Sequence, residues 1–158
     1  MVVPVKFIVD ENVGQLAKWL RMIGYDAILL QGTDDGELVK IAHKEGRVLL
    51  TRDTQILQRR VITNHEVKAV LIRSDRTKEQ LEQVMKELGL QCYTRQFTRC
   101  MECNTLLEPK SKEEVKGIVP PYIFRTQEQY MLCPGCHRIY WRGTHWQRMK
   151  KRIDNLER

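Results

Sequence analysis

The sequence predicts an α/β protein with a parallel sheet flanked by helices, followed by a small metal-binding module. Two observations lead to this prediction. In the first 90 residues, short apolar runs alternate with segments of helical periodicity, which is typical of parallel sheets covered by helices on both faces. Beyond residue 97, four of the chain's five cysteines form two C-x-x-C pairs. Without secretory features, this spacing indicates a metal site rather than disulfides.

Short apolar runs predict four strands, at residues 5–9, 27–30, 48–50 and 67–72. Apolar residues three or four positions apart predict three helices, within residues 13–23, 38–45 and 81–88. Gly24, Gly46 and Gly89 follow these stripes and are expected to end the helices. Ile56 and Leu57 predict a shorter helix after the third strand.

Acidic residues follow two of the strands and open one helix. Asp10 comes directly after the first strand, Asp53 lies three residues past the third, and Asp34 and Asp35 start the second helix. Sites in open parallel sheets lie just beyond the carboxyl ends of the strands, so we expect these acids at one edge. Carboxylates gathered there repel one another unless a hard cation such as Mg²⁺ or Mn²⁺ lies among them. Such a cation can activate a water and stabilise the charge of a phosphate.

Each acid also has a purely structural interpretation. Asp10 and Asp53 are residues that favour the start of a helix, and Asp34 with Glu37 matches a capping box. Position alone leaves both interpretations open. The sequence contains no Gly-rich phosphate loop, no G-x-S-x-G motif and no Cys–His spacing that would point to another chemistry.

The two C-x-x-C pairs, separated by 29 residues, predict a closed tetrahedral zinc site. Its four ligands would be Cys100, Cys103, Cys133 and Cys136. The residue after each pair often needs a positive φ, and here it is Asn104 and His137, types that adopt this conformation more readily than most. A redox dithiol is the alternative for one pair, but two pairs in a small module disfavour it.

The stretch between the two pairs is polar and contains three prolines. It predicts an irregular excursion with one short helix near residues 111–116, where Ser111 and Glu114 fit a capping box. After the second pair, residues 139–141 predict a strand, and Thr144 is expected to cap a helix over residues 145–156.

The second part of the chain is the more basic. The whole chain has 27 Lys and Arg against 20 Asp and Glu, a net charge of +7, and residues 97–158 hold 12 of these bases and 7 of these acids. The predicted last helix carries Arg148, Lys150, Lys151 and Arg152. With Trp141 and Trp146 close by, these cations suit single-stranded RNA. Alternatively the tryptophans pack the small module, and we favour packing for at least one of them.

Composition excludes several classes of protein. The 42% hydrophobic and 30% charged residues are normal for a globular protein and unlike a disordered chain, a collagen or a coiled coil. No apolar run approaches the roughly 20 residues that cross a bilayer, and no signal-peptide cleavage site follows the apolar start. We therefore expect a cytoplasmic protein with no membrane partner.

The motifs VDENVGQLAKWLRMIGYDA and DDGELVKIAHKEGRVLLTRD, with the two C-x-x-C pairs, SKEEVKGIVPPY and YWRGTHWQRM, resemble the Mut7-C ribonuclease family, a branch of the PIN-like nucleases. The resemblance covers nearly the whole chain. It implies a PIN-like nuclease domain, here residues 1–95, and a fused zinc ribbon with a basic C-terminal helix, here residues 97–158. By position, it implies that Asp10, Asp35 and Asp53 hold a catalytic Mg²⁺ or Mn²⁺.

The chain departs from the family pattern at two positions, where Gly36 replaces an acidic residue and Gln15 replaces an arginine. PIN-like sites often carry a fourth acid, for which the candidates are Asp34, Glu37 and Asp75.

The sequence thus predicts a metal-dependent ribonuclease that hydrolyses RNA with the help of its zinc ribbon. Arg52 and nearby cations are expected to neutralise the scissile phosphate. The alternatives are a non-catalytic RNA- or ribosome-binding adaptor, whose acids only cap helices, and a protein-interaction module with a basic face.

Overall fold

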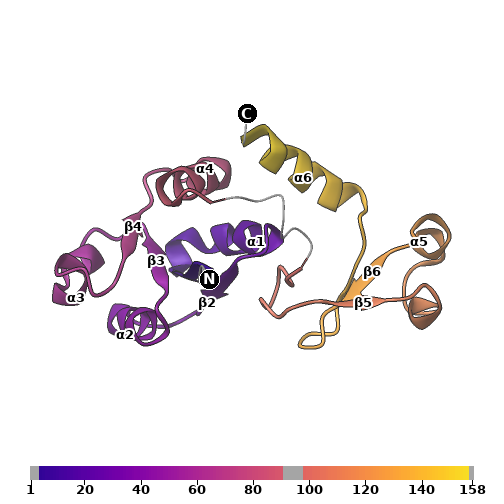
Figure 1. Cartoon of the computed structure of the whole chain (residues 1–158), viewed down its shortest axis with the longest axis horizontal. Helices are drawn as coiled ribbons and strands as arrows, with labels where there is room; N and C mark the ends of the chain where they lie inside the picture. Colours follow the sequence, from indigo (N-terminus) through magenta and orange to yellow (C-terminus); the bar gives the residue numbers. More distant parts are fainter. Residues whose placement is uncertain (1–3, 91–97, 157–158) are drawn as a thin grey trace.

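The computed structural model describes residues 4–90 and 98–156. The first part contains a four-stranded parallel sheet in the order β2-β1-β3-β4 (Figure 1). Its strands are β1 (Lys6–Val9), β2 (Asp26–Leu29), β3 (Val48–Thr51) and β4 (Ala69–Leu71). Both the parallel pairing and the four predicted strands are confirmed. Every residue of the central strand β3 is buried, as expected for a parallel sheet covered on both faces.

Helices cover both faces of this sheet (Figure 1). They are α1 (Gly14–Met22), α2 (Asp35–Glu45), α3 (Arg60–Thr63) and α4 (Thr77–Leu88), with 3₁₀ turns η1 (Glu11–Val13) and η2 (Ile56–Gln58). Alternate residues of β1 point to opposite faces, so Phe7 and Val9 pack with α1 and α4, while Ile8 packs with α2. The predicted flanking helices are therefore confirmed.

Glycines end two of the helices as predicted. Gly46 follows α2 with φ 66° and Gly89 follows α4 with φ 62°, a left-handed conformation that costs glycine little. At the other end of α2, the side chain of Asp34 accepts the backbone N–H of Glu37 at 2.8 Å. The capping role predicted for Asp34 is therefore correct.

The second part forms a three-stranded antiparallel sheet in the order β5-β6-β7. Its elements are β5 (Glu108–Lys110), η3 (Glu113–Val115), α5 (Pro121–Thr126), β6 (Tyr130–Leu132) and β7 (Ile139–Tyr140). The prediction of an irregular excursion between the cysteine pairs was wrong for β5, α5 and β6. The predicted capping box at the start of η3 is confirmed, because Ser111 N–H bonds Glu114 Oε2 at 2.7 Å and Glu114 N–H bonds Ser111 Oγ at 3.3 Å.

The last helix, α6 (Thr144–Leu156), turns back toward α1 and α4 (Figure 1). Its Met149 and Ile153 are buried in the same apolar cluster as Leu16 and Leu81 of those two helices. The second part of the chain therefore completes the core of the first. Cys92 and the predicted division between residues 95 and 97 lie outside the described residues. No helix in the described ranges is long and apolar enough to cross a membrane.

Candidate functional site

Asp10 is held at the carboxyl edge of the parallel sheet by its neighbours on β3. Its carboxylate Oδ2 accepts a hydrogen bond from Thr51 Oγ1 at 2.7 Å, and its backbone N–H donates to Leu50 O at 2.9 Å. Asp10 precedes the turn η1, but its side chain makes no capping hydrogen bond there. The structure therefore gives no support to helix capping as the reason for an acid at this position.

Asp53 is tied to the same threonine. Its backbone N–H donates to Thr51 Oγ1 at 3.0 Å, and its own Oδ1 accepts the N–H of Gln55 at 2.8 Å. One carboxylate oxygen of Asp53 thus stabilises the turn after β3, so the structural interpretation of this acid holds in part. Thr51 is fully buried. Sequence analysis missed its role because a β-branched residue inside a strand is expected on packing grounds alone.

Asp35 is the first residue of α2 and lies within electrostatic reach of the other two acids. Partial burial raises the pKa of Asp35, and the charges of Asp53 and Asp10 raise this pKa further, while Arg59 opposes them. In the described part of the chain, only the four cysteines form a group of three or more potential ligands within 4.8 Å of one another. The three carboxylates therefore share one edge without closing into a tight cluster.

The other predicted site residues have different surroundings. Asp34 caps α2 through its carboxylate, Glu37 is exposed, and Asp75 lines a cavity at the start of α4. Arg52 is exposed and its backbone N–H donates to Asn12 Oδ1 at 3.3 Å. Of the three candidates for a fourth acid, Glu37 is therefore the one that neither caps α2 nor lines the cavity.

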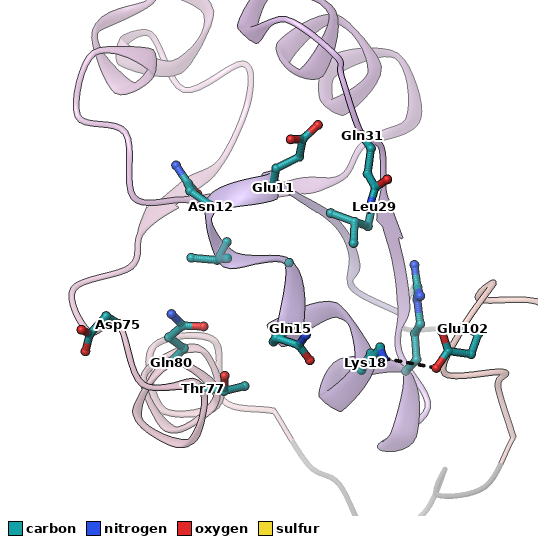
Figure 2. Close-up of a pocket in the computed structure, with 13 residues that line it drawn as sticks. Glu11, Asn12, Gln15, Lys18, Leu29, Gln31, Asp75, Thr77, Gln80 and Glu102 are labelled. Atoms are coloured by element: carbon teal, nitrogen blue, oxygen red, sulfur yellow. Dashed lines mark ion pairs between the residues drawn. The ribbon is translucent and has the colours of Figure 1, made fainter.

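A cavity of about 630 Å³ opens at this edge between the starts of α1 and α4 (Figure 2). Its walls come from η1 and α1, the end of β2, the start of α4 and the loop between Cys100 and Cys103. An ion pair of 3.2 Å joins Lys18 on α1 to Glu102 in that loop. The sequence did not predict this cavity, because its walls are far apart along the chain.

The four predicted zinc ligands are brought together. The Sγ atoms of Cys100, Cys103, Cys133 and Cys136 all lie within 4.8 Å of one another. The positive φ predicted after each pair is confirmed, at 72° for Asn104 and 64° for His137. Gly135 leaves no room for a side chain, since an added Cβ would lie 2.8 Å from Thr105 Oγ1.

Hydrogen bonds lower the pKa of Cys103 and Cys136 and favour their thiolates, whereas burial raises the pKa of Cys133 to about 11. Burial alone would raise the pKa of Cys103, but hydrogen bonds, chiefly with Thr105, lower it to about 6. The Tyr140 hydroxyl lies 2.9 Å from Cys100 Sγ. Burial, and then the hydrogen bond to Cys100, raises the pKa of Tyr140, so its hydroxyl stays a donor. Four cysteines grouped in this way suit a structural zinc ion, which would bind all four as thiolates.

The loop between Cys100 and Cys103 is hydrogen-bonded to the edge strand β2. Arg21, which is only 5% exposed, donates from Nε to Ala27 O and from Nη1 to Met101 O, both at 2.8 Å. Asn104 accepts the N–H of Ala27 at 3.0 Å and donates to Asp26 Oδ1 at 2.7 Å. Sequence analysis missed the role of Arg21, because a helical arginine is usually exposed.

The basic helix α6 forms one wall of a smaller hollow of about 290 Å³, which Arg148 and Arg152 line together with Trp19. Lys150 instead pairs with Asp154 at 2.9 Å. Trp141 packs against the small core around Tyr130, and Trp146 packs against the large core cluster. The prediction that at least one of these two tryptophans packs is therefore confirmed.

The family model described as the Mut7-C RNAse domain matches residues 5–153. Comparisons with curated proteins and with solved structures found no significant match. The matched range includes both the parallel sheet with its acidic edge and the four-cysteine cluster. The chain therefore belongs to the Mut7-C RNAse domain family.

Proposed function

We propose that the protein is a metal-dependent ribonuclease of the PIN-like type, which hydrolyses single-stranded RNA at the carboxyl edge of its parallel sheet. The observation that carries this proposal is the gathering of Asp10, Asp35 and Asp53 at that edge, seen in the raised pKa of Asp35 and in the threonine shared by the other two. Membership of an RNAse family supports RNA as the substrate.

Oxygen donors such as these carboxylates suit Mg²⁺ or Mn²⁺. When bound, such an ion would activate a water and offset the negative charge that develops on the phosphate. The chain itself orients the carboxylates, because Thr51 holds Asp10 and the N–H of Gln55 holds Asp53. Arg59, which lies within electrostatic reach of Asp35, is placed to attract the phosphate backbone.

In this proposal the zinc ribbon has a structural role and adds affinity for RNA. Zinc on the four cysteines would fix the loop whose Met101 is bonded to Arg21 of α1. Arg148 and Arg152, which are exposed and line the smaller hollow, would contact phosphates.

The test is a cleavage assay on labelled single-stranded RNA with added Mg²⁺ or Mn²⁺. Asp10→Asn and Asp53→Asn should each lower the cleavage rate by at least about 100-fold, since several kcal/mol of stabilisation depend on the metal. The control is Asp34→Asn, which should cleave like the wild type because Asn and Asp cap helices equally well.

RNA affinity and melting temperature should stay close to wild type in all three variants. Cleavage that survives both Asp10→Asn and Asp53→Asn would overturn the proposal. RNA binding without any cleavage by the wild type would favour the adaptor instead.

A further inference from the structure

The large cavity opens next to the acidic edge, although Asp10, Asp35 and Asp53 do not line it. Glu11 and Asn12, which follow Asp10 in the chain, form one of its walls, and Thr77 and Gln80 at the start of α4 stand opposite (Figure 2). The volume of about 630 Å³ lies within the range of roughly 300–1,000 Å³ typical of small-molecule sites. A group bound here would therefore lie beside the proposed cleavage site.

Four amide side chains line this cavity, those of Asn12, Gln15, Gln31 and Gln80. Gln15 and Gln31 line it, and neither amide makes a hydrogen bond within the described residues. Gln80 is only 4% exposed, and its Nε2 donates to Ser74 O at 2.9 Å. This bond fixes the orientation of the amide, and the Gln80 Oε1 has no hydrogen-bond partner in the described part of the chain. Each amide offers both donors and an acceptor, the mixture that the edges of unpaired nucleobases present.

The charges around the cavity disfavour a phosphate inside it. Its walls carry the three carboxylates of Glu11, Asp75 and Glu102 against the two cations Lys18 and Arg21. Lys18 is paired with Glu102 at 3.2 Å, and the guanidinium of Arg21 is bonded to two backbone carbonyls. A neutral, hydrogen-bonding ligand is therefore favoured over an anion.

Two arginines line the adjoining smaller hollow. The smaller hollow shares Gln15, Lys18 and Glu102 with the cavity, so the two are neighbours, and Arg148 and Arg152 also line the smaller hollow. A nucleic acid strand has this same division, since its backbone is charged and its bases are neutral.

We propose that the cavity receives one unpaired base of an RNA strand, bonded to the amides of Gln15, Gln31 and Gln80, while Arg148 and Arg152 contact the flanking phosphates. RNA as the ligand rests on the function proposed above. The cavity adds a site where the enzyme reads a base at a fixed distance from the bond that it cuts.

The test compares two probes by fluorescence anisotropy, without added Mg²⁺ or Mn²⁺ so that no cleavage occurs. One probe is a short single-stranded RNA and the other is an abasic strand of the same length and charge. Wild-type protein should bind the RNA at least about tenfold more tightly than the abasic strand. The double variant Gln15→Met, Gln31→Met, which keeps side-chain size, should lose about tenfold in affinity for the RNA, as expected for two or so hydrogen bonds, and nothing for the abasic strand.

The matched control is Gln129→Met, an exposed glutamine that does not line the cavity, and it should bind both probes like the wild type. Equal affinity of the double variant and the wild type for the RNA would overturn the base site, as would an equal loss for both probes.

Cleavage distinguishes the two proposals. Base-dependent binding without cleavage would overturn the proposed nuclease activity and support the base site. Cleavage with base-independent binding would overturn the base site and support the nuclease activity.

Discussion

The hydroxyl group of Thr51 donates a hydrogen bond of 2.7 Å to the carboxylate of Asp10. The same hydroxyl accepts the backbone N–H of Asp53 at 3.0 Å. One fully buried side chain therefore fixes the relative position of acids that come from two different strands. Because β1 and β3 are neighbours in the sheet, this arrangement sets the geometry of the proposed metal site before any metal binds.

Replacement of this hydroxyl should impair cleavage more than it impairs folding. Thr51→Val keeps the shape of the side chain but removes both hydrogen bonds, so we expect a loss of about 1–2 kcal/mol in the free energy of unfolding. The specificity constant for RNA cleavage should fall by about 10- to 100-fold, because a loosened carboxylate positions the metal poorly. Thr51→Ser, which retains the hydroxyl, should lie close to wild type in urea unfolding and in steady-state cleavage. Equal cleavage by the valine variant would show that Thr51 only supports the fold.

The raised pKa of Asp35 predicts a stability change with a definite dependence on pH. Folding favours the protonated form, so this contribution to stability is fully present below the unfolded pKa of about 3.9 and is lost as the pH rises through the folded pKa. At pH 7, without added Mg²⁺ or Mn²⁺, Asp35→Asn should raise the melting temperature by about 1–2 °C. The difference should shrink as the pH falls toward 3.9.

With added Mg²⁺ the wild type should instead melt at a higher temperature than Asp35→Asn, because Mg²⁺ binds the folded wild type and stabilises it. Thermal unfolding with and without Mg²⁺ measures both effects, with Asp34→Asn as the control outside the site. A melting temperature of the wild type that is insensitive to Mg²⁺ up to millimolar concentration would contradict the assignment of Asp35 as a ligand.

The cysteine cluster should hold one zinc ion per chain, as measured by elemental analysis of protein purified without chelator. Cys133→Ser should lose this zinc and several kcal/mol of folding free energy. The loss should extend to the parallel sheet, because Arg21 bonds the cysteine loop and Ile153 of α6 lies in the core beneath α1. If the sheet instead unfolds as in the wild type, the two parts fold separately, as the division at residues 95–97 predicts.

The bridge between the cysteine loop and β2 can be tested without disturbing the backbone. In Asn104→Gly the glycine adopts the φ of 72° readily, but two side-chain hydrogen bonds are lost. The free energy of unfolding should therefore fall by about 1–3 kcal/mol. His137 has φ 64° at the equivalent position of the other pair and its side chain is exposed. His137→Gly should therefore change the unfolding free energy by less than about 0.5 kcal/mol. Equal effects of the two substitutions in chemical denaturation would argue against the bridge.

The salt dependence of RNA binding should report on Arg148 and Arg152. Each phosphate contact to a single strand contributes roughly 0.7 to the slope of log affinity against log salt, so Arg148→Gln, Arg152→Gln should reduce the slope by about 1.4. Lys150→Gln should change it little, since Lys150 already pairs with Asp154 at 2.9 Å. A double variant with the wild-type slope would mean that this face of α6 does not contact the RNA backbone.

Local signals account for what the sequence predicts correctly. Short apolar runs and helical stripes indicate the parallel sheet and its helices, and Gly46 and Gly89 mark helix ends through a backbone conformation that is local to them. The same reason makes the positive φ of Asn104 and His137 predictable. The strands β5 and β6 were missed because each has only three residues and no alternation long enough to recognise.

Long-range contacts account for what the sequence does not predict. The hydrogen-bond partner of the buried Arg21 is Met101, which lies 80 positions away in the chain. No pattern within α1 indicates this contact. The packing of α6 against α1 and α4 also joins segments that lie far apart in the chain, so it too has no local signal. The sequence places Asp10 and Asp53 at one edge through the general geometry of parallel strands, but their link through Thr51 depends on side-chain positions that only the folded chain defines.

The return of α6 also has a consequence for biosynthesis. Helix α4 ends at Leu88 and α6 begins at Thr144. At roughly 5–20 residues per second, α6 leaves the ribosome about 3–11 s after the helices it covers. During that interval the apolar surface that Met149 and Ile153 later bury faces water on the nascent chain. Chaperones that hold exposed apolar surface would therefore find their binding site here, and a message truncated before α6 would yield a protein that displays it permanently.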